Sequence, residues 1–162
     1  MLADLARQYG YLDISGEARQ SAIDTYAVQS RLFPEVKDTL ERLLAVGVKM
    51  IVASDNDRDI LAAQRAKYDL DRYFSDYCIS EDAGSYKPAD GFQASLRKHL
   101  ADGSANCYFV GDTSYDVECG KRLGIKSVLV ARRAPDAAEA DYIIQGLDRL
   151  ISLLRIRQPG QS

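Results

Sequence analysis

The sequence predicts an α/β fold in which helices cover both faces of a parallel sheet. Short apolar runs, such as Met50-Ile51-Val52-Ala53, alternate along the chain with longer segments whose apolar residues recur at helical spacing. The 162 residues suffice for one domain with a substantial core. None of the apolar runs is long enough to cross a bilayer.

Five short apolar runs predict the strands. In chain order they cover residues 48–53, 77–79, 106–110, 127–130 and 142–144. Helical patterns separate most of these runs, which is the arrangement of βαβ units and therefore of a parallel sheet.

Five segments with helical spacing predict the helices of this sheet. In chain order they cover residues 34–46, 57–68, 88–100, 114–123 and 147–154. The first has Pro34 in its first turn and Gly47 just after its end, and both residues are favourable at those positions. Gly124 closes the fourth helix in the same way.

The first 33 residues follow a different pattern, because they contain helical spacing without an apolar strand. Apolar residues from Leu2 to Tyr9 form a stripe that Gly10 ends. Ser15 then suits the N-cap of a helix over residues 17–32. This helix-turn-helix pair is predicted to be a cap over the sheet or an interaction surface.

Composition excludes several classes of partner. The net charge of −3 gives no electrostatic reason to bind nucleic acid or an anionic membrane. The three cysteines have no Cys-x-x-Cys spacing, which argues against a disulfide framework or a zinc site. The N-terminus lacks the pattern of a signal peptide, so the reducing cytoplasm is the expected location.

Polar residues follow the first two predicted strands. Ser54 and Asp55 come directly after the strand that ends at Ala53, at the edge where open α/β sheets bind ligands. Capping of the next helix would explain them equally well. Lys87 is held extended by Pro88 and can direct its ammonium group toward the strand ends. The alternative for Lys87 is an ordinary solvated loop lysine.

Two carboxylates follow the third strand. Asp112 comes directly after Gly111, and Asp116 lies one helical turn further along the same face. Carboxylate oxygens at a strand end suit Mg²⁺, which usually takes one or two of them and completes its shell with water and phosphate. The alternative is a helix N-terminus that favours acidic residues, with Asp112 as its cap.

Ser54, Lys87 and the aspartate pair occur in this order at separate strand ends, and in this the chain resembles the haloacid dehalogenase superfamily. The motifs that carry the resemblance are Val52-Ala53-Ser54, Gly84-Ser85-Tyr86-Lys87-Pro88 and Gly111-Asp112-Thr113-Ser114-Tyr115-Asp116. The resemblance implies a Rossmann-like three-layer parallel sheet as the core. It assigns residues 1–33 to a remnant helical cap, 34–154 to the core and 155–162 to a polar tail.

The resemblance also implies a reaction, namely Mg²⁺-dependent hydrolysis of a small phosphorylated metabolite through an aspartyl-phosphate. Ser54 and Lys87 would be catalytic, and together with Asp55 they would bind the substrate. Asp112 would bind Mg²⁺ directly, and Asp116 would bind it or orient its water shell. The acidic pair favours the phosphatases over the metal-free dehalogenases.

One motif of the superfamily, a strand that ends in Asp-x-Asp and carries the nucleophile, is not found before Ser54. Asp13 is the only candidate, but Ser15 stands where the second acid is expected. We therefore expect a truncated chain that is inactive alone. The missing strand would be central, so its neighbours should either close together or accept a strand from a second copy or a partner. The alternative is a non-catalytic module that binds phosphate, Mg²⁺ or a protein.

Overall fold

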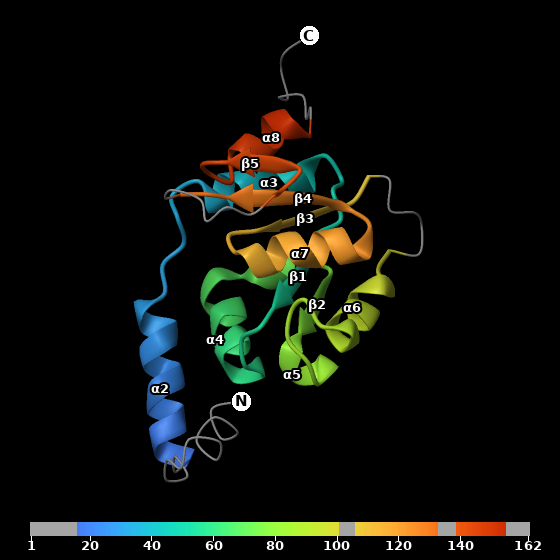
Figure 1. Cartoon of the computed structure of the whole chain (residues 1–162). Helices are drawn as coiled ribbons and strands as arrows, with labels where there is room; N and C mark the ends of the chain where they lie inside the picture. Colours follow the sequence, from blue (N-terminus) through green and yellow to red (C-terminus); the bar gives the residue numbers. More distant parts are fainter. Residues whose placement is uncertain (1–15, 101–105, 133–138, 155–162) are drawn as a thin grey trace.

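Five parallel strands form two small sheets in the computed structural model, which describes residues 16–100, 106–132 and 139–154. In the first sheet, β1 (Ile51–Ser54) pairs with β2 (Asp76–Ile79). In the second, β4 (Lys126–Val130) lies between β3 (Tyr108–Gly111) and β5 (Tyr142–Ile144). All three pairings are parallel, which confirms the predicted fold class (Figure 1).

Among the residues that the structure describes, no backbone pairing joins the two sheets. Within the described ranges, β1 and β3 each have a hydrogen-bonded neighbour on one side only, and they do not pair with each other. The expectation that these strands could close together is therefore wrong for this structure. Pairing with a second copy or a partner stays a prediction, and Asp13 lies outside the described residues.

The helices agree with the predicted order and differ mainly at their ends. The predicted elements are α2 (Gly16–Gln29), α3 (Val36–Ala45), α4 (Arg58–Tyr68), α6 (Asp90–Arg97), α7 (Ser114–Leu123) and α8 (Arg149–Leu153). Two short elements were not predicted, the 3-10 turn η1 (Leu70–Arg72) and α5 (Ser80–Ala83). The predicted stripe at residues 2–9 and the cap at Ser15 lie outside the described residues. None of the helices described is long and apolar enough to cross a membrane.

The core has two sides because strand side chains alternate between the faces of a sheet. On one side, Phe109 of β3 packs with residues of α6 and α7, and Ile51 and Ala53 of β1 pack against the same cluster. On the other side, Tyr108 and Val110 pack against a cluster that includes Leu150 of α8. Side-chain packing therefore links the two sheets although no backbone ladder does.

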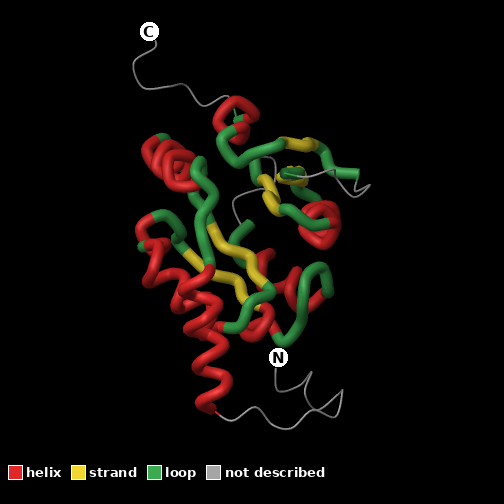
Figure 2. The backbone as a smooth tube through the Cα atoms, turned by 90° about the vertical axis from the view of Figure 1, so that its left-hand side faces the viewer, coloured by secondary structure: helices red, strands yellow, loops and turns green. Residues whose placement is uncertain are grey.

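The helix α2 lies alongside α4 (Figures 1 and 2). Its C-terminal end is held by two side chains from the end of α4. The hydroxyl of Tyr68 donates to the carbonyl of Ser30 at 2.5 Å, and Nζ of Lys67 donates to the carbonyl of Val28 at 3.1 Å. These bonds attach the predicted cap segment to the C-terminal end of α4.

Candidate functional site

The carboxyl ends of β1 and β3 are bridged by Lys87, from the loop after α5. Nζ of Lys87 lies 2.6 Å from Oδ1 of Asp116 and 3.5 Å from the carbonyl oxygen of Ala53. Because all strands are parallel, these ends lie at the edge where open α/β sheets bind ligands. The structure thus brings Lys87 and Asp116 together although they are far apart in the sequence.

Lys87 is not a solvated loop lysine. Its side chain is only 12% exposed, and the Asp116 side chain beside it is 7% exposed. A buried ammonium needs a carboxylate partner, because its desolvation would otherwise be costly. The ion pair therefore fixes the ammonium between the two strand ends.

Both carboxylate oxygens of Asp116 have partners. Oδ1 accepts from Lys87, while Oδ2 accepts from the backbone amides of Asp112 and Thr113 at 3.2 and 3.1 Å and from Oγ1 of Thr113 at 2.7 Å. Thr113 is the N-cap of α7 and forms a capping box with Asp116. The predicted alternative of Asp112 as the cap is therefore wrong. A Thr-x-x-Asp pattern before a helix could have identified this pair from the sequence.

Asp112 has the opposite environment. It is exposed, and within the described part of the chain its carboxylate accepts no recorded hydrogen bond. Mg²⁺ commonly binds through one or two carboxylates with water and phosphate as further ligands, so Asp112 fits this ion as a direct ligand. Asp116 fits better as the residue that fixes the strand end and Lys87. The described residues contain no group of three or more His, Cys, Asp or Glu side chains that could hold a metal.

Ser54 and Asp55 stand at the end of β1, as predicted. Oγ of Ser54 accepts from the amide of Asn56 at 3.1 Å and is half-buried, so its hydroxyl hydrogen can still be donated. Asp55 does not cap the next helix, because Asp57 is the N-cap of α4. Instead, Oδ1 of Asp55 accepts from the amide of Lys87 at 3.0 Å.

Cysteine chemistry is excluded at this edge of the sheet. Cys119 lies in α7, next to the residues of the site, and is fully buried. Burial raises the pKa of the Cys119 thiol to about 11, so it is protonated near neutral pH. Cys119 is therefore a core residue and not a nucleophile.

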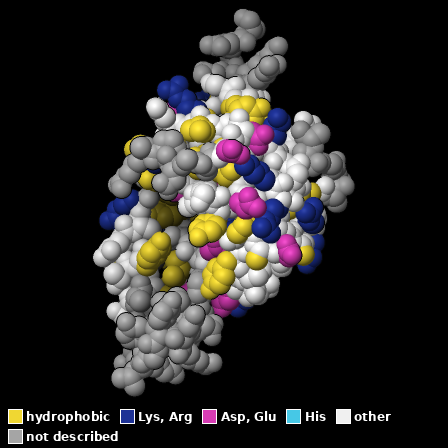
Figure 3. Space-filling model, viewed as in Figure 1, with side chains coloured by type: hydrophobic (Ala, Val, Ile, Leu, Met, Phe, Trp, Pro, Cys, Tyr) yellow, Lys and Arg dark blue, Asp and Glu magenta, His cyan; other side chains and the backbone are white. Residues whose placement is uncertain are grey.

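Apolar surface is available near these groups. Tyr86 and Tyr115, which directly precede Lys87 and Asp116 in the chain, are 49% and 62% exposed. Figure 3 shows hydrophobic side chains gathered around a hollow between α2 and α7 on one face of the molecule. This surface could contact the organic part of a ligand.

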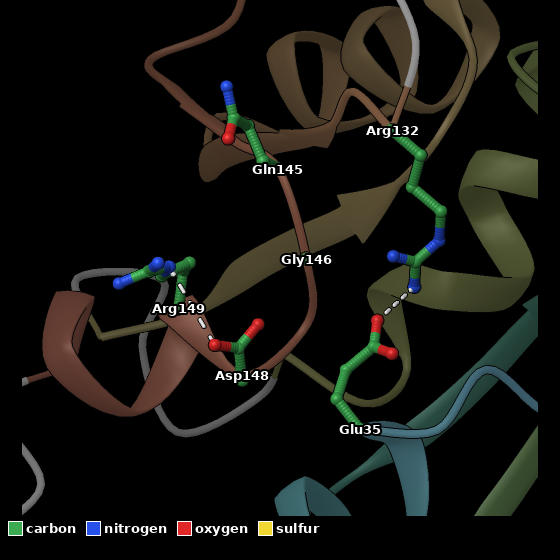
Figure 4. A pocket seen from close by; sticks show the side chains of 6 residues that line it. All are labelled: Glu35, Arg132, Gln145, Gly146, Asp148 and Arg149. Carbon is green, nitrogen blue, oxygen red and sulfur yellow. Dashed lines mark ion pairs between the residues drawn. The ribbon is translucent and has the colours of Figure 1, made fainter.

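A second hollow of about 400 Å³ lies at the carboxyl ends of β4 and β5 (Figure 4). Arg132 reaches across it to Glu35, with Nη2 of Arg132 2.7 Å from Oε1 of Glu35. The same guanidinium group stacks 3.7 Å above the ring centre of Phe33. Arg149 and Asp148 pair with each other on its open side. Sequence reasoning missed Glu35 and Arg132, because no motif marks them.

Glu35, which lines this second hollow just after the predicted cap, contacts residues of the core. Oε1 of Glu35 also accepts from the amide of Leu147 at 3.4 Å. The pKa of Glu35 lies below its ordinary value because its own amide, the Leu147 amide and the Arg132 charge stabilise the carboxylate. Charges on this surface are paired, so we assign it a structural role.

Comparisons with known proteins found a matching family profile, related sequences and similar solved structures. A family profile of haloacid dehalogenase-like hydrolases matches residues 12–130. The phosphoglycolate phosphatase of Aquifex aeolicus is 28% identical over 111 residues, which are 68% of this chain and 52% of that protein. The phosphoglycolate phosphatase of Escherichia coli K12 is 27% identical over 128 residues, which are 76% of this chain and 51% of that protein. The chain spans about half the length of these curated relatives.

Solved structures show the same fold. A HAD phosphatase from Thermococcus onnurineus aligns with a TM-score of 0.75 at 22% identity, over 84% of this chain and 64% of that one. The range matched by the family profile contains Ser54, Lys87, Asp112 and Asp116. The predicted resemblance is thereby confirmed. The chain belongs to the haloacid dehalogenase-like hydrolase family.

Proposed function

We propose that the protein is a phosphatase of this family that hydrolyses a monoester of a small phosphorylated metabolite with Mg²⁺. One observation carries the proposal: the Lys87 ammonium is held at the carboxyl ends of β1 and β3 by Asp116, and the exposed Asp112 directly follows β3. The similarity to phosphoglycolate phosphatases supports the same reaction class. Free and mostly buried cysteines suit a cytoplasmic enzyme.

In the proposed reaction, Ser54 donates its hydroxyl hydrogen to a phosphoryl oxygen. Lys87 neutralises negative charge on the phosphoryl group, and it costs no reorganisation because its position is already fixed. Asp116 holds Lys87 and the end of β3 in place. The exposed tyrosines Tyr86 and Tyr115 are available to contact the organic part of the substrate.

The metal has a defined place in this proposal. Asp112 would hold Mg²⁺ at the end of β3, and Asp116 would keep that strand end in position. When bound, Mg²⁺ neutralises charge that develops on the phosphoryl oxygens.

The nucleophile would be an aspartate outside the described residues, on a strand next to β1 and β3. Its carboxylate would attack phosphorus and break the bond to the ester oxygen, which takes a proton from an acid and leaves as the alcohol. Water would then hydrolyse the aspartyl-phosphate, releasing phosphate and restoring the carboxylate.

A second candidate function is a binding module without turnover. It is favoured by the edge of β1 that faces away from β2 and by the edge of β3 that faces away from β4. Neither edge has a backbone partner within the described ranges. Unpaired strand edges are a template for a strand from another chain. A second copy or a partner protein would then supply the missing strand.

The test is a phosphatase assay of the purified protein with Mg²⁺ and small phosphate monoesters, including phosphoglycolate. Turnover that Asp112→Asn abolishes supports the phosphatase. Loss of turnover in Asp13→Asn would identify Asp13 as the nucleophile. Binding of Mg²⁺ or phosphate without turnover supports the second candidate. Absence of both binding and turnover overturns both proposals.

A further inference from the structure

Asp55 contacts both ends of Lys87. Its Oδ1 accepts a hydrogen bond from the backbone amide of Lys87 at 3.0 Å, and its Oδ2 lies 3.9 Å from Nζ of the same residue. The two residues are 32 positions apart in the sequence. One carboxylate therefore ties the end of β1 to the loop that carries Lys87.

The hydrogen bond from the Lys87 backbone amide to Asp55 determines where the loop lies. The ion pair between Lys87 and Asp116 determines where the end of the side chain lies. Lys87 has a long flexible side chain, so its ammonium group is fixed only if both the backbone and the far end are held. Asp116 holds the far end at 2.6 Å, and Asp55 holds the backbone. The side chain of Asp55 is 36% exposed, so its charge also faces the surrounding solvent.

The charge of Asp55 has a second consequence for an anionic ligand. Two carboxylates, Asp55 and Asp116, share the single positive charge of Lys87, so the three groups together carry a net negative charge. A phosphate that approaches Lys87 is repelled by Asp55. At about 5 Å in water this repulsion is about 0.8 kcal/mol for each unit of charge, or roughly fourfold in affinity.

We propose that Asp55 is a positioning residue for Lys87 and that its charge weakens the binding of phosphate at the same edge. The first statement rests on the contacts of Asp55 alone. The second also rests on the proposed function, because it needs a phosphate at Lys87. Asp55 thus acts on the substrate through Lys87 and through its charge.

Two substitutions separate the hydrogen bond from the charge. Asp55→Asn removes the charge but keeps an oxygen that can accept from the Lys87 amide, whereas Asp55→Ala removes both. The two variants have the same net charge, and only Asp55→Asn keeps a side-chain amide that can accept from the Lys87 backbone. Asp59→Asn, an exposed position in the first turn of α4, makes the same change of charge outside the contact.

The first measurement is amide hydrogen exchange at Lys87 by nuclear magnetic resonance. We expect Asp55→Asn and Asp59→Asn to keep the protection of the Lys87 amide within about twofold, and Asp55→Ala to lower it at least tenfold, since an amide that loses its acceptor exchanges faster. Equal protection in Asp55→Asn and Asp55→Ala would overturn the positioning role. The unfolding midpoint in urea, measured for each variant, distinguishes this local effect from global destabilisation.

The second measurement is titration with inorganic phosphate in the presence of Mg²⁺. We expect Asp55→Asn to bind phosphate more tightly than the unsubstituted chain, by about fourfold for each unit of charge on the phosphate. Asp55→Ala should bind more weakly than Asp55→Asn, because Lys87 is then less well placed. Unchanged affinity in Asp55→Asn overturns the effect of charge. Absence of phosphate binding in every variant counts against the proposed function, whereas the amide measurement still decides the positioning role.

Discussion

Gly111 and Asp116 are so close that no side chain fits between them. A Cβ atom placed on Gly111 would lie 2.2 Å from Cγ of Asp116 and 2.4 Å from its Oδ2. Real Cβ atoms do not approach other atoms this closely. The glycine before Asp112 is thus required by the position of the buried carboxylate that holds Lys87.

Substitution of Gly111 by alanine should therefore displace Asp116. We expect a loss of about 1–3 kcal/mol in the free energy of unfolding, the usual cost of forcing extra volume into a packed site. Urea denaturation measures it. Gly16→Ala is the matched control, because a Cβ atom at Gly16 meets nothing within 4 Å. An equally small change in the free energy of unfolding in both variants would contradict the tight contact between Gly111 and Asp116.

The two aspartates of the pair should respond differently to substitution. Asp116→Ala leaves the buried ammonium of Lys87 without its main partner and should destabilise the fold by about 3–5 kcal/mol. Asp112→Asn should leave stability unchanged within about 0.5 kcal/mol, because Asp112 is exposed. It should instead weaken Mg²⁺ binding in calorimetric titration. A large loss of stability in Asp112→Asn would show that this side chain has a structural role.

Stability should fall in acid through Asp141. The amide and hydroxyl of Ser127 both donate to Oδ2 of Asp141 at 2.8 Å, and they hold the pKa of this carboxyl below its ordinary value. A carboxyl whose pKa is lower in the folded state stabilises the fold above its unfolded pKa of about 3.9. That contribution is lost as the pH falls below about 4 toward the folded pKa. Urea unfolding between pH 3 and 6 should show a shallower dependence in Asp141→Asn.

The contact of Arg132 with Glu35 and Phe33 should hold the segment that joins α2 to α3. Arg132→Ala removes an ion pair and a cation–π contact at a partly buried site, and about 1–2 kcal/mol of stability should be lost. Amides of residues 31–36 should exchange faster. Arg149→Ala is the control, because Arg149 lines the same hollow but, among the described residues, forms an ion pair only with its exposed neighbour Asp148. Equal effects in the two variants would refute a specific role for Arg132.

Local signals in the sequence predicted the elements better than their assembly. The helix at residues 114–123 was predicted with the bounds observed for α7, because Gly124 adopts a left-handed conformation that ends it. The strand predicted at 48–53 is shifted in the structure to Ile51–Ser54, since hydrophobicity marks a buried run and not its hydrogen bonds. The short helix α5 has too few residues to show a period.

Candidate residues could be identified from the sequence, but their contacts could not. The motifs predicted that Lys87 and Asp116 lie at the same edge of the sheet, yet their ion pair joins positions 29 residues apart and depends on tertiary packing. The link from Asp55 to the Lys87 amide is of the same kind. From the sequence pattern, it was equally plausible that Asp55 caps the next helix. The folded chain distinguishes this capping role from the contact with Lys87.

The division of the strands into two sheets has a consequence for how the molecule opens. Each sheet comes from one continuous stretch of chain, with β1 and β2 in the first and β3, β4 and β5 in the second. Within the described ranges, side chains that include Phe92 and Phe109 join the two halves in one cluster. Regions without shared backbone pairing tend to be separate cooperative units. We therefore expect that one half of this fold loosens while the other keeps its order, and the candidate site with Lys87 and Asp116 lies on the boundary between them.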